Sequence, residues 1–236
     1  MVEEKAALKI QRFFASYRSQ KQTTVQQAIS TSPASKLLRA FDLRFQCMRA
    51  VAAAKFPINK PIEDVAQVAR VIASIKGLAE REGIVNLDAI ERLFHQSILL
   101  AERIQAPYYY VIWNKTYPST GVDSVRLINH AYQQLCGVVR SFELSIACDP
   151  EKLDAESLDV LGLAREIIQH ASKTIVEVLV DPRQVLNEIS REEFTTTFEK
   201  MLAEYMTPNS LLRSKENIQF LAQDVALLCN EGMRFK

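Results

Sequence analysis

The sequence predicts an all-α protein, and three observations support this fold class. Apolar residues recur at three- and four-residue spacing along most of the 236-residue chain, as on the buried face of an amphipathic helix. Only six glycines and eight prolines are present, which favours long helices over tight turns. No segment shows the pattern of a strand, and no internal repeat is found. We therefore expect a bundle of about six to eight long helices joined by short loops, including extra helices at both ends.

The composition is that of an ordinary soluble globular protein, with 48% hydrophobic and 24% charged residues. A net charge of +1 gives no reason to expect nucleic acid or an anionic membrane as the main partner. The N-terminal segment MVEEKAALKIQRFF has no apolar core of a signal peptide, and no run reaches the length of a membrane span. We expect a cytoplasmic protein, with export by a route that reads no N-terminal signal left open.

The first predicted helix covers residues 3–20 and is amphipathic. Within it, residues 6–21 resemble an IQ motif, the helical segment that binds calmodulin-like proteins. Ile10 and Gln11 fit the motif, whereas Ala15 stands where that family has a basic residue. The resemblance implies a calmodulin-like partner, and the alternative is an amphipathic helix that packs on the bundle.

The second predicted helix covers about residues 34–56, after a polar linker. Ser32 or Ser35 can cap its N-terminus, since a serine hydroxyl accepts a bond from a free backbone N–H of the first turn. Pro57 and Pro61 should end it.

The third predicted helix covers about residues 62–82, with Gly83 in the position that follows a helix C-terminus. The fourth begins after Asn86, a plausible N-cap. Pro107 should kink or end this helix. The aromatic run that follows, residues 108–113, is interpreted as core or a packed corner.

The fifth and sixth predicted helices cover about residues 122–147 and 155–180. Cys136 and Cys148 would then share one helix about 18 Å apart along it, too far to form a disulfide bond. All four cysteines have apolar sequence neighbours, so we expect reduced core residues.

The tail of the chain should form two more helices. Ser190 and Glu193 make a capping-box pattern before the first, and Pro208 separates it from the second. We divide the chain into an N-terminal helix and linker (1–33), a central helical domain (34–180) and a C-terminal helical extension (181–236).

One stretch, Arg44 to Asp64, combines cations, small residues and an acid. Arg44 and Lys55 are eleven residues apart, almost three helical turns, so both project from one helix face at roughly 16 Å along the axis. Alanines surround Lys55, and a turn marked by two prolines then delivers Glu63 and Asp64. Two cations and an acid on a bend suit a small polyanionic ligand.

The spacing of Arg44, Lys55 and the segment 61–64 (PIED) resembles the all-helical, AroQ-type chorismate mutases, most of all their larger, gamma subclass. The block 93–105 (LFHQSILLAERIQ) is also similar to that family, and the similar blocks cover about residues 40–115. The resemblance implies conversion of chorismate to prephenate, a step of aromatic amino acid biosynthesis in the shikimate pathway. This pericyclic rearrangement needs orientation and charge stabilisation and requires no cofactor.

The resemblance also implies a role for each matching residue. Arg44 would pair with a substrate carboxylate, and Lys55 would reach a carboxylate and the ether oxygen. Gln105 would donate to the ether oxygen from the opposite wall, while Asp64 and Glu102 would bind on the side of the ring hydroxyl. The alternative is that these residues form the solvated edge of an amphipathic helix and a helix N-terminus.

This sequence departs from the family at several positions. Gln67 stands where the family commonly has an arginine, and Arg70, one turn further, is a candidate to replace it. A later arginine of the larger subclass could correspond to Arg126 or Arg140. The departures lead to a second hypothesis, a mutase-like helical interaction protein with weak or no activity. A third is that the extra helices dock on another enzyme of aromatic biosynthesis or form a homodimer.

Other catalytic signatures are absent from the sequence. The three histidines, His95, His130 and His170, lie on separate predicted helices without the spacing of metal ligands, and no glycine-rich phosphate loop is present. We expect no metal site.

Overall fold

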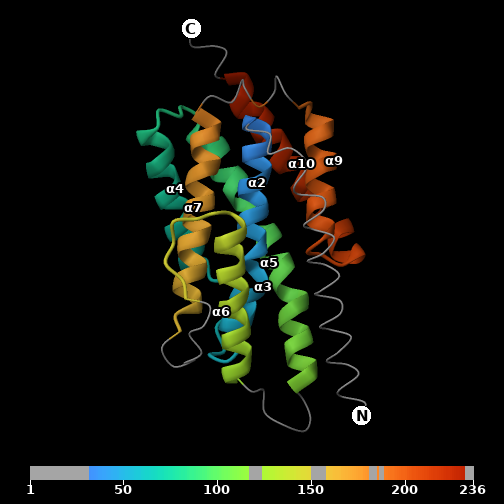
Figure 1. Ribbon diagram of the computed structural model, residues 1–236. Helices are drawn as coiled ribbons and strands as arrows, with labels where there is room; N and C mark the ends of the chain where they lie inside the picture. Colours follow the sequence, from blue (N-terminus) through green and yellow to red (C-terminus); the bar gives the residue numbers. More distant parts are fainter. Residues whose placement is uncertain (1–31, 117–123, 150–157, 181–184, 186–188, 232–236) are drawn as a thin grey trace. The chain divides into compact units, whose positions relative to one another are not determined.

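A computed structural model describes residues 32–116, 124–149, 158–180, 185 and 189–231. Within these residues every regular element is an α-helix, as the sequence predicts (Figure 1). The predicted N-terminal helix with its IQ-like segment lies outside the described residues. No helix of the described part is long and apolar enough to cross a lipid bilayer.

Most of the helices follow each other with short connections, but residues 142–159 separate α6 from α7. Their bounds are α2 Pro33–Gln46, α3 Met48–Lys55, α4 Val65–Arg81, α5 Leu87–Thr116, α6 Ser124–Ser141, α7 Val160–Val180, α9 Arg191–Ala203 and α10 Pro208–Glu231. Residue contacts place α2 against α7, α3 against α5 and α6, α4 against α5, and α10 along α5.

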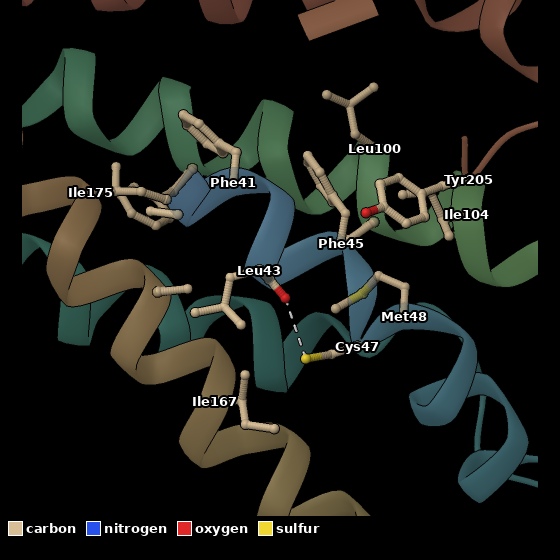
Figure 2. Packing of buried hydrophobic residues seen from close by; sticks show 14 of the residues in the cluster. Phe41, Leu43, Phe45, Cys47, Met48, Leu100, Ile104, Ile167, Ile175 and Tyr205 are labelled. Atoms are coloured by element: carbon tan, nitrogen blue, oxygen red, sulfur yellow. Dashed lines mark hydrogen bonds between the residues drawn. The ribbon is translucent and has the colours of Figure 1, made fainter. Parts of the chain in front are cut away.

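Helices α2 and α3 form the single predicted helix 34–56, interrupted at Cys47. Ser32 is the N-cap, and its hydroxyl accepts a bond from the Ser35 backbone N–H at 3.3 Å. The thiol of Cys47 donates to the carbonyl of Leu43 at 3.4 Å (Figure 2). Phe45 and Met48, on either side of the interruption, face the α5 side chains around Leu100 (Figure 2).

Several predicted helix ends are confirmed by their hydrogen bonds. Asn86 accepts from the Ala89 N–H at 2.8 Å at the start of α5. Ser190 and Glu193 form a complete capping box at α9. Gly83 follows α4 with a φ of 80°, and the Ile84 N–H bonds the Ala79 carbonyl at 2.9 Å, as in a Schellman motif.

The predicted end of the fifth helix is wrong, and so is one of the two alternatives predicted at Pro107, a kink or an end. α5 does not end at Pro107 but continues through it to Thr116, so the aromatic run 108–113 lies inside α5. α6 does not extend to residue 147 but ends at Ser141, where Glu143 adopts a φ of 54°. The Leu144 N–H then bonds the Val139 carbonyl at 3.0 Å, which closes the helix and redirects the chain. Consequently Cys136 and Cys148 do not share a helix.

The C-terminal helices α9 and α10 belong to the same core as the preceding ones. Phe198 of α9 packs edge-on against Phe41, with ring centroids 5.2 Å apart, and against Phe45 at 6.0 Å. Along the described part of α10, the buried hydrophobic residues of the core are Ile218, Leu221, Ala222, Val225 and Leu228. The described residues from Ser32 onward therefore form one compact unit.

Candidate functional site

The predicted site residues that the fold buries lie along the seam between α2/α3 and α5. Met48 is one helical turn beyond Arg44, and Lys55 is two turns beyond Met48. The Gln105 amide of α5 reaches the sulfur of Met48 at 3.5 Å. Gln105 therefore lies opposite a point between Arg44 and Lys55 along the helix axis.

Arg44 is a buried cation whose side chain is only 4% exposed. Its Nη1 donates to the hydroxyl of Ser172 on α7 at 2.9 Å, and its guanidinium lies 5.8 Å from the centre of the Phe94 ring. No hydrogen bond reaches its Nε, and no carboxylate among the described residues pairs with it. Burial lowers the pKa of Arg44 to about 10, so the group stays charged at neutral pH.

Gln105 is buried as well, at 5% exposure. Its Nε2 makes only long contacts, to the Met48 sulfur and to the Ala101 carbonyl at 3.4 Å, and its Oε1 has no hydrogen-bond partner. Ser97 is fully buried with an unbonded hydroxyl. Phe94, Ser97, Ala101 and Gln105 succeed each other at three- and four-residue spacing, so they line one face of α5.

Lys55 is half-buried at the end of α3 and donates through Nζ to the Ile62 carbonyl at 2.7 Å. Burial and the neighbouring Lys60 lower the pKa of Lys55, while Asp64 and Glu102 oppose that effect. Burial and repulsion from Glu63 raise the pKa of the Glu102 carboxyl on α5, while attraction by Lys55 opposes this rise. Lys55 and Glu102 are therefore close enough to influence each other electrostatically.

Asp64, Gln67 and Arg70 form a separate group at the start of α4. Asp64 is the N-cap, accepting from the Gln67 N–H at 2.9 Å, and its second oxygen lies 3.8 Å from Lys60. Its pKa is lowered mainly by that backbone bond. The Gln67 side chain accepts from Arg70 at 2.9 Å, and Arg70 is exposed. Only Asp64 of the three is linked electrostatically to Lys55.

The two later arginines lie on the exposed side of α6. Arg126 and Arg140 are both exposed, and the Nε of Arg140 donates to the Cys136 carbonyl of its own helix at 3.4 Å. Neither has a contact with Arg44, Lys55 or Gln105 among the interactions described. In the described part of the chain, no group of three or more histidine, cysteine or acidic residues could hold a metal ion.

The sequence reasoning missed two site residues, Ser97 and Ser172. Ser97 could have been found, because it shares the face of α5 defined by Phe94 and Gln105. Ser172 had no such signal, because it lies 128 residues from Arg44 in the chain, and only the packing of α2 against α7 joins them.

No protein-family model, curated protein or solved structure matches this chain.

Proposed function

We propose that the seam between α2/α3 and α5 binds a folded dicarboxylate and that the protein is a chorismate mutase. The observation that supports this most is the set of buried polar atoms without hydrogen bonds: Arg44 Nε, Ser97 Oγ and Gln105 Oε1. An unbonded buried polar atom costs about 1–3 kcal/mol, and more if charged. Carboxylate oxygens of a ligand would accept from the first two, Arg44 Nε and the Ser97 hydroxyl.

Arg44 would hold one carboxylate of chorismate through its unbonded Nε edge. Its Nη1 is already held by Ser172, so the planar guanidinium is oriented before the ligand arrives. A buried arginine without a carboxylate partner is costly, and an anionic ligand removes that cost.

Gln105 would donate to the ether oxygen, where negative charge develops as the C–O bond breaks. Its present contacts through Nε2, at 3.4 Å and 3.5 Å, are long enough to be exchanged for a shorter bond to a ligand. Lys55 would supply the positive charge on the other side of the same oxygen. Glu102 would accept from the ring hydroxyl.

The start of α4 is where this chain departs most from the family that it resembles. The position where the family has an arginine holds Gln67 here. The Gln67 side chain accepts from Arg70 on the exposed side of the helix. A charge-assisted hydrogen bond is worth about 1.5–3 kcal/mol. We therefore expect slower turnover or weaker substrate binding than the complete set of cations would give.

The first test is the ultraviolet assay of chorismate consumption with the purified full-length chain. Lys55→Ala should lower kcat by about 100-fold or more, because it removes positive charge where negative charge develops. Lys173→Ala is the matched control. Lys173 is an exposed helical lysine that pairs only with Glu177, at 3.6 Å, and its removal should leave turnover unchanged.

Binding separates a slow enzyme from a protein that is not a mutase. Calorimetry with a bicyclic transition-state analogue of the rearrangement should give heat for the wild type and much less for Lys55→Ala. If the wild type neither consumes chorismate nor binds the analogue, the proposed function is wrong.

A further inference from the structure

The segment after α6 returns alongside that helix and brings two cysteines together. The backbone N–H of Asp149 donates to the hydroxyl of Tyr132 at 3.3 Å, which fixes the end of the segment beside the middle of α6. Cys148 precedes Asp149, and Cys136 is one helical turn beyond Tyr132. The bond from Asp149 to Tyr132 and the helical spacing of Tyr132 and Cys136 therefore place Cys148 near Cys136.

The three side chains are close enough to affect one another electrostatically. Tyr132 and Cys136 influence each other's pKa, and Cys148 is among the groups that raise the pKa of both. Cys136 is fully buried, and burial is the main cause that raises its pKa. Cys148 is partly exposed, so it is the thiol of the pair that a small reagent can reach.

We propose that Cys136 and Cys148 are a disulfide-forming pair, oxidised by exchange with a small-molecule disulfide such as oxidised glutathione. The pair is twelve residues apart in the chain, and the bond from Asp149 to Tyr132 holds Cys148 beside the part of α6 that carries Cys136, so a disulfide bond needs no rearrangement of the helices. The bond would attach the segment 142–149 covalently to α6.

The exchange occurs in two balanced steps. The Cys148 thiolate attacks one sulfur of the small disulfide, and the bond between its two sulfurs breaks; one thiolate leaves and takes up the proton that Cys148 lost. The Cys136 sulfur then attacks Cys148 in the mixed disulfide and displaces the second small thiolate, which takes up the proton of Cys136. Both cysteines are oxidised, and one small disulfide is reduced to two thiols.

Cys47 provides the internal control. It is fully buried, its thiol donates to the Leu43 carbonyl, and burial raises its pKa to about 12. No other cysteine contacts it among the described residues. A buried thiol of this kind is inert to exchange, so Cys47 should stay reduced under conditions that oxidise the pair.

The test treats the native full-length protein with oxidised glutathione, blocks free thiols by alkylation, and maps peptides without reduction. The expected product is a peptide pair linked through Cys136 and Cys148, with Cys47 alkylated only after denaturation. Cys136→Ser should stop at the mixed disulfide on Cys148, and Cys47→Ser should form the linked pair as the wild type does. The linked form should melt about 5–10 °C higher, because the bond closes a short loop.

Two results would overturn the proposal. One is a wild-type protein in which Cys148 keeps glutathione while Cys136 remains free. The other is a protein in which both thiols stay reduced in an excess of oxidised glutathione. The wild-type map decides either case by itself, so a variant that fails to fold does not weaken the test.

Discussion

At the residue scale, the hydroxyl of Ser172 is the contact that orients Arg44. It accepts from Arg44 Nη1 at 2.9 Å and donates to the carbonyl of Ile168 at 2.8 Å, so the position of the hydroxyl is fixed by its own helix. Arg44 is the only charged residue buried within α2, and among the described residues α7 supplies its only hydrogen bond to a side chain. Ser172 is thus a positioning residue for the proposed carboxylate site.

Ser172→Ala should therefore raise KM for chorismate about 10-fold or more while changing kcat less. The reason is that Arg44 would hold a carboxylate equally in the substrate and in the transition state, which is uniform binding. A hydrogen bond to a charged group is worth about 1.5–3 kcal/mol, which sets the size of the effect. Steady-state kinetics with the ultraviolet assay measure both constants.

The matched control for this prediction is Thr174→Ala. Thr174 makes the same type of bond within α7, to the His170 carbonyl at 3.1 Å, but lies on the exposed side of the helix. Its replacement should leave KM unchanged. Equal KM values for Ser172→Ala and the wild type would show that Ser172 does not position Arg44.

The sequence could indicate Arg44, Lys55 and Gln105 because each lies in a local pattern of spacing. The burial of these side chains could not be predicted from the same local pattern. Arg44 is 4% exposed, and one of the helices that it contacts, α7, is more than one hundred residues away in the chain. Asp64 shows the reverse, because its position at a helix N-terminus is local and was one of the interpretations that the sequence allows, although the helix begins at Val65 and not near residue 62.

At the element scale, helix ends with a side-chain signature were predictable. Asn86 and the pair Ser190–Glu193 are visible in the sequence because a cap needs particular residues within four positions. The end of α6 had no such signature, since Glu143 occupies the left-handed position where glycine is usual. Of the two outcomes predicted at Pro107, a kink or an end, the end is wrong, because a proline can remain inside a helix that its neighbours hold in place.

The packing of α9 yields a second prediction, on stability. Phe198 is fully buried and contacts three other rings, with Phe194 stacked at 5.6 Å in addition to Phe41 and Phe45. Phe198→Ala should lower the free energy of unfolding by about 3–5 kcal/mol, because it removes apolar contacts and leaves a cavity in the core. Urea denaturation followed by circular dichroism measures the loss.

Phe220→Ala is the control of the same type. Phe220 lies on α10 with 45% of its side chain exposed, and its replacement should cost far less. If both variants lost the same small amount, α9 would not be part of the core, and residues 32–180 would be the folded unit.

At the scale of the whole molecule, polar contacts join α5 to α10. Arg92 of α5 donates to Asp224 of α10 at 3.0 Å, and the Asn217 amide donates to Gln96 at 2.7 Å. The Asp224 carboxylate is 6% exposed, whereas Arg92 is about half exposed. The fold therefore carries one buried acid at the contact between α5 and the C-terminal helix, with a partner that remains partly solvated.

This acid gives the unfolding free energy a pH dependence of predictable sign. Burial raises the pKa of Asp224 above its ordinary value of 3.8, and Arg92 opposes that rise only in part. In the pH range between the two values the folded state binds more protons than the unfolded state, so stability falls as pH rises. The unfolding free energy of the wild type, measured relative to Asp224→Asn, should therefore decline from about pH 4 upward and level off above the raised pKa.

Glu91→Gln tests the sign, because Glu91 has the opposite shift. Lys76 pairs with Glu91 at 2.5 Å and lowers the pKa of that carboxyl. The pair therefore contributes fully to the unfolding free energy above the ordinary pKa of a glutamate, and this contribution is lost as pH falls through the lowered pKa of the folded state. As pH rises, the wild type should become more stable relative to Glu91→Gln. Over part of the same pH range, it should become less stable relative to Asp224→Asn. Urea denaturation at several pH values between about 3 and 7 measures both differences. Slopes of the same sign would mean that Arg92 fully offsets the burial of Asp224 and that the contact between α5 and α10 carries no uncompensated charge.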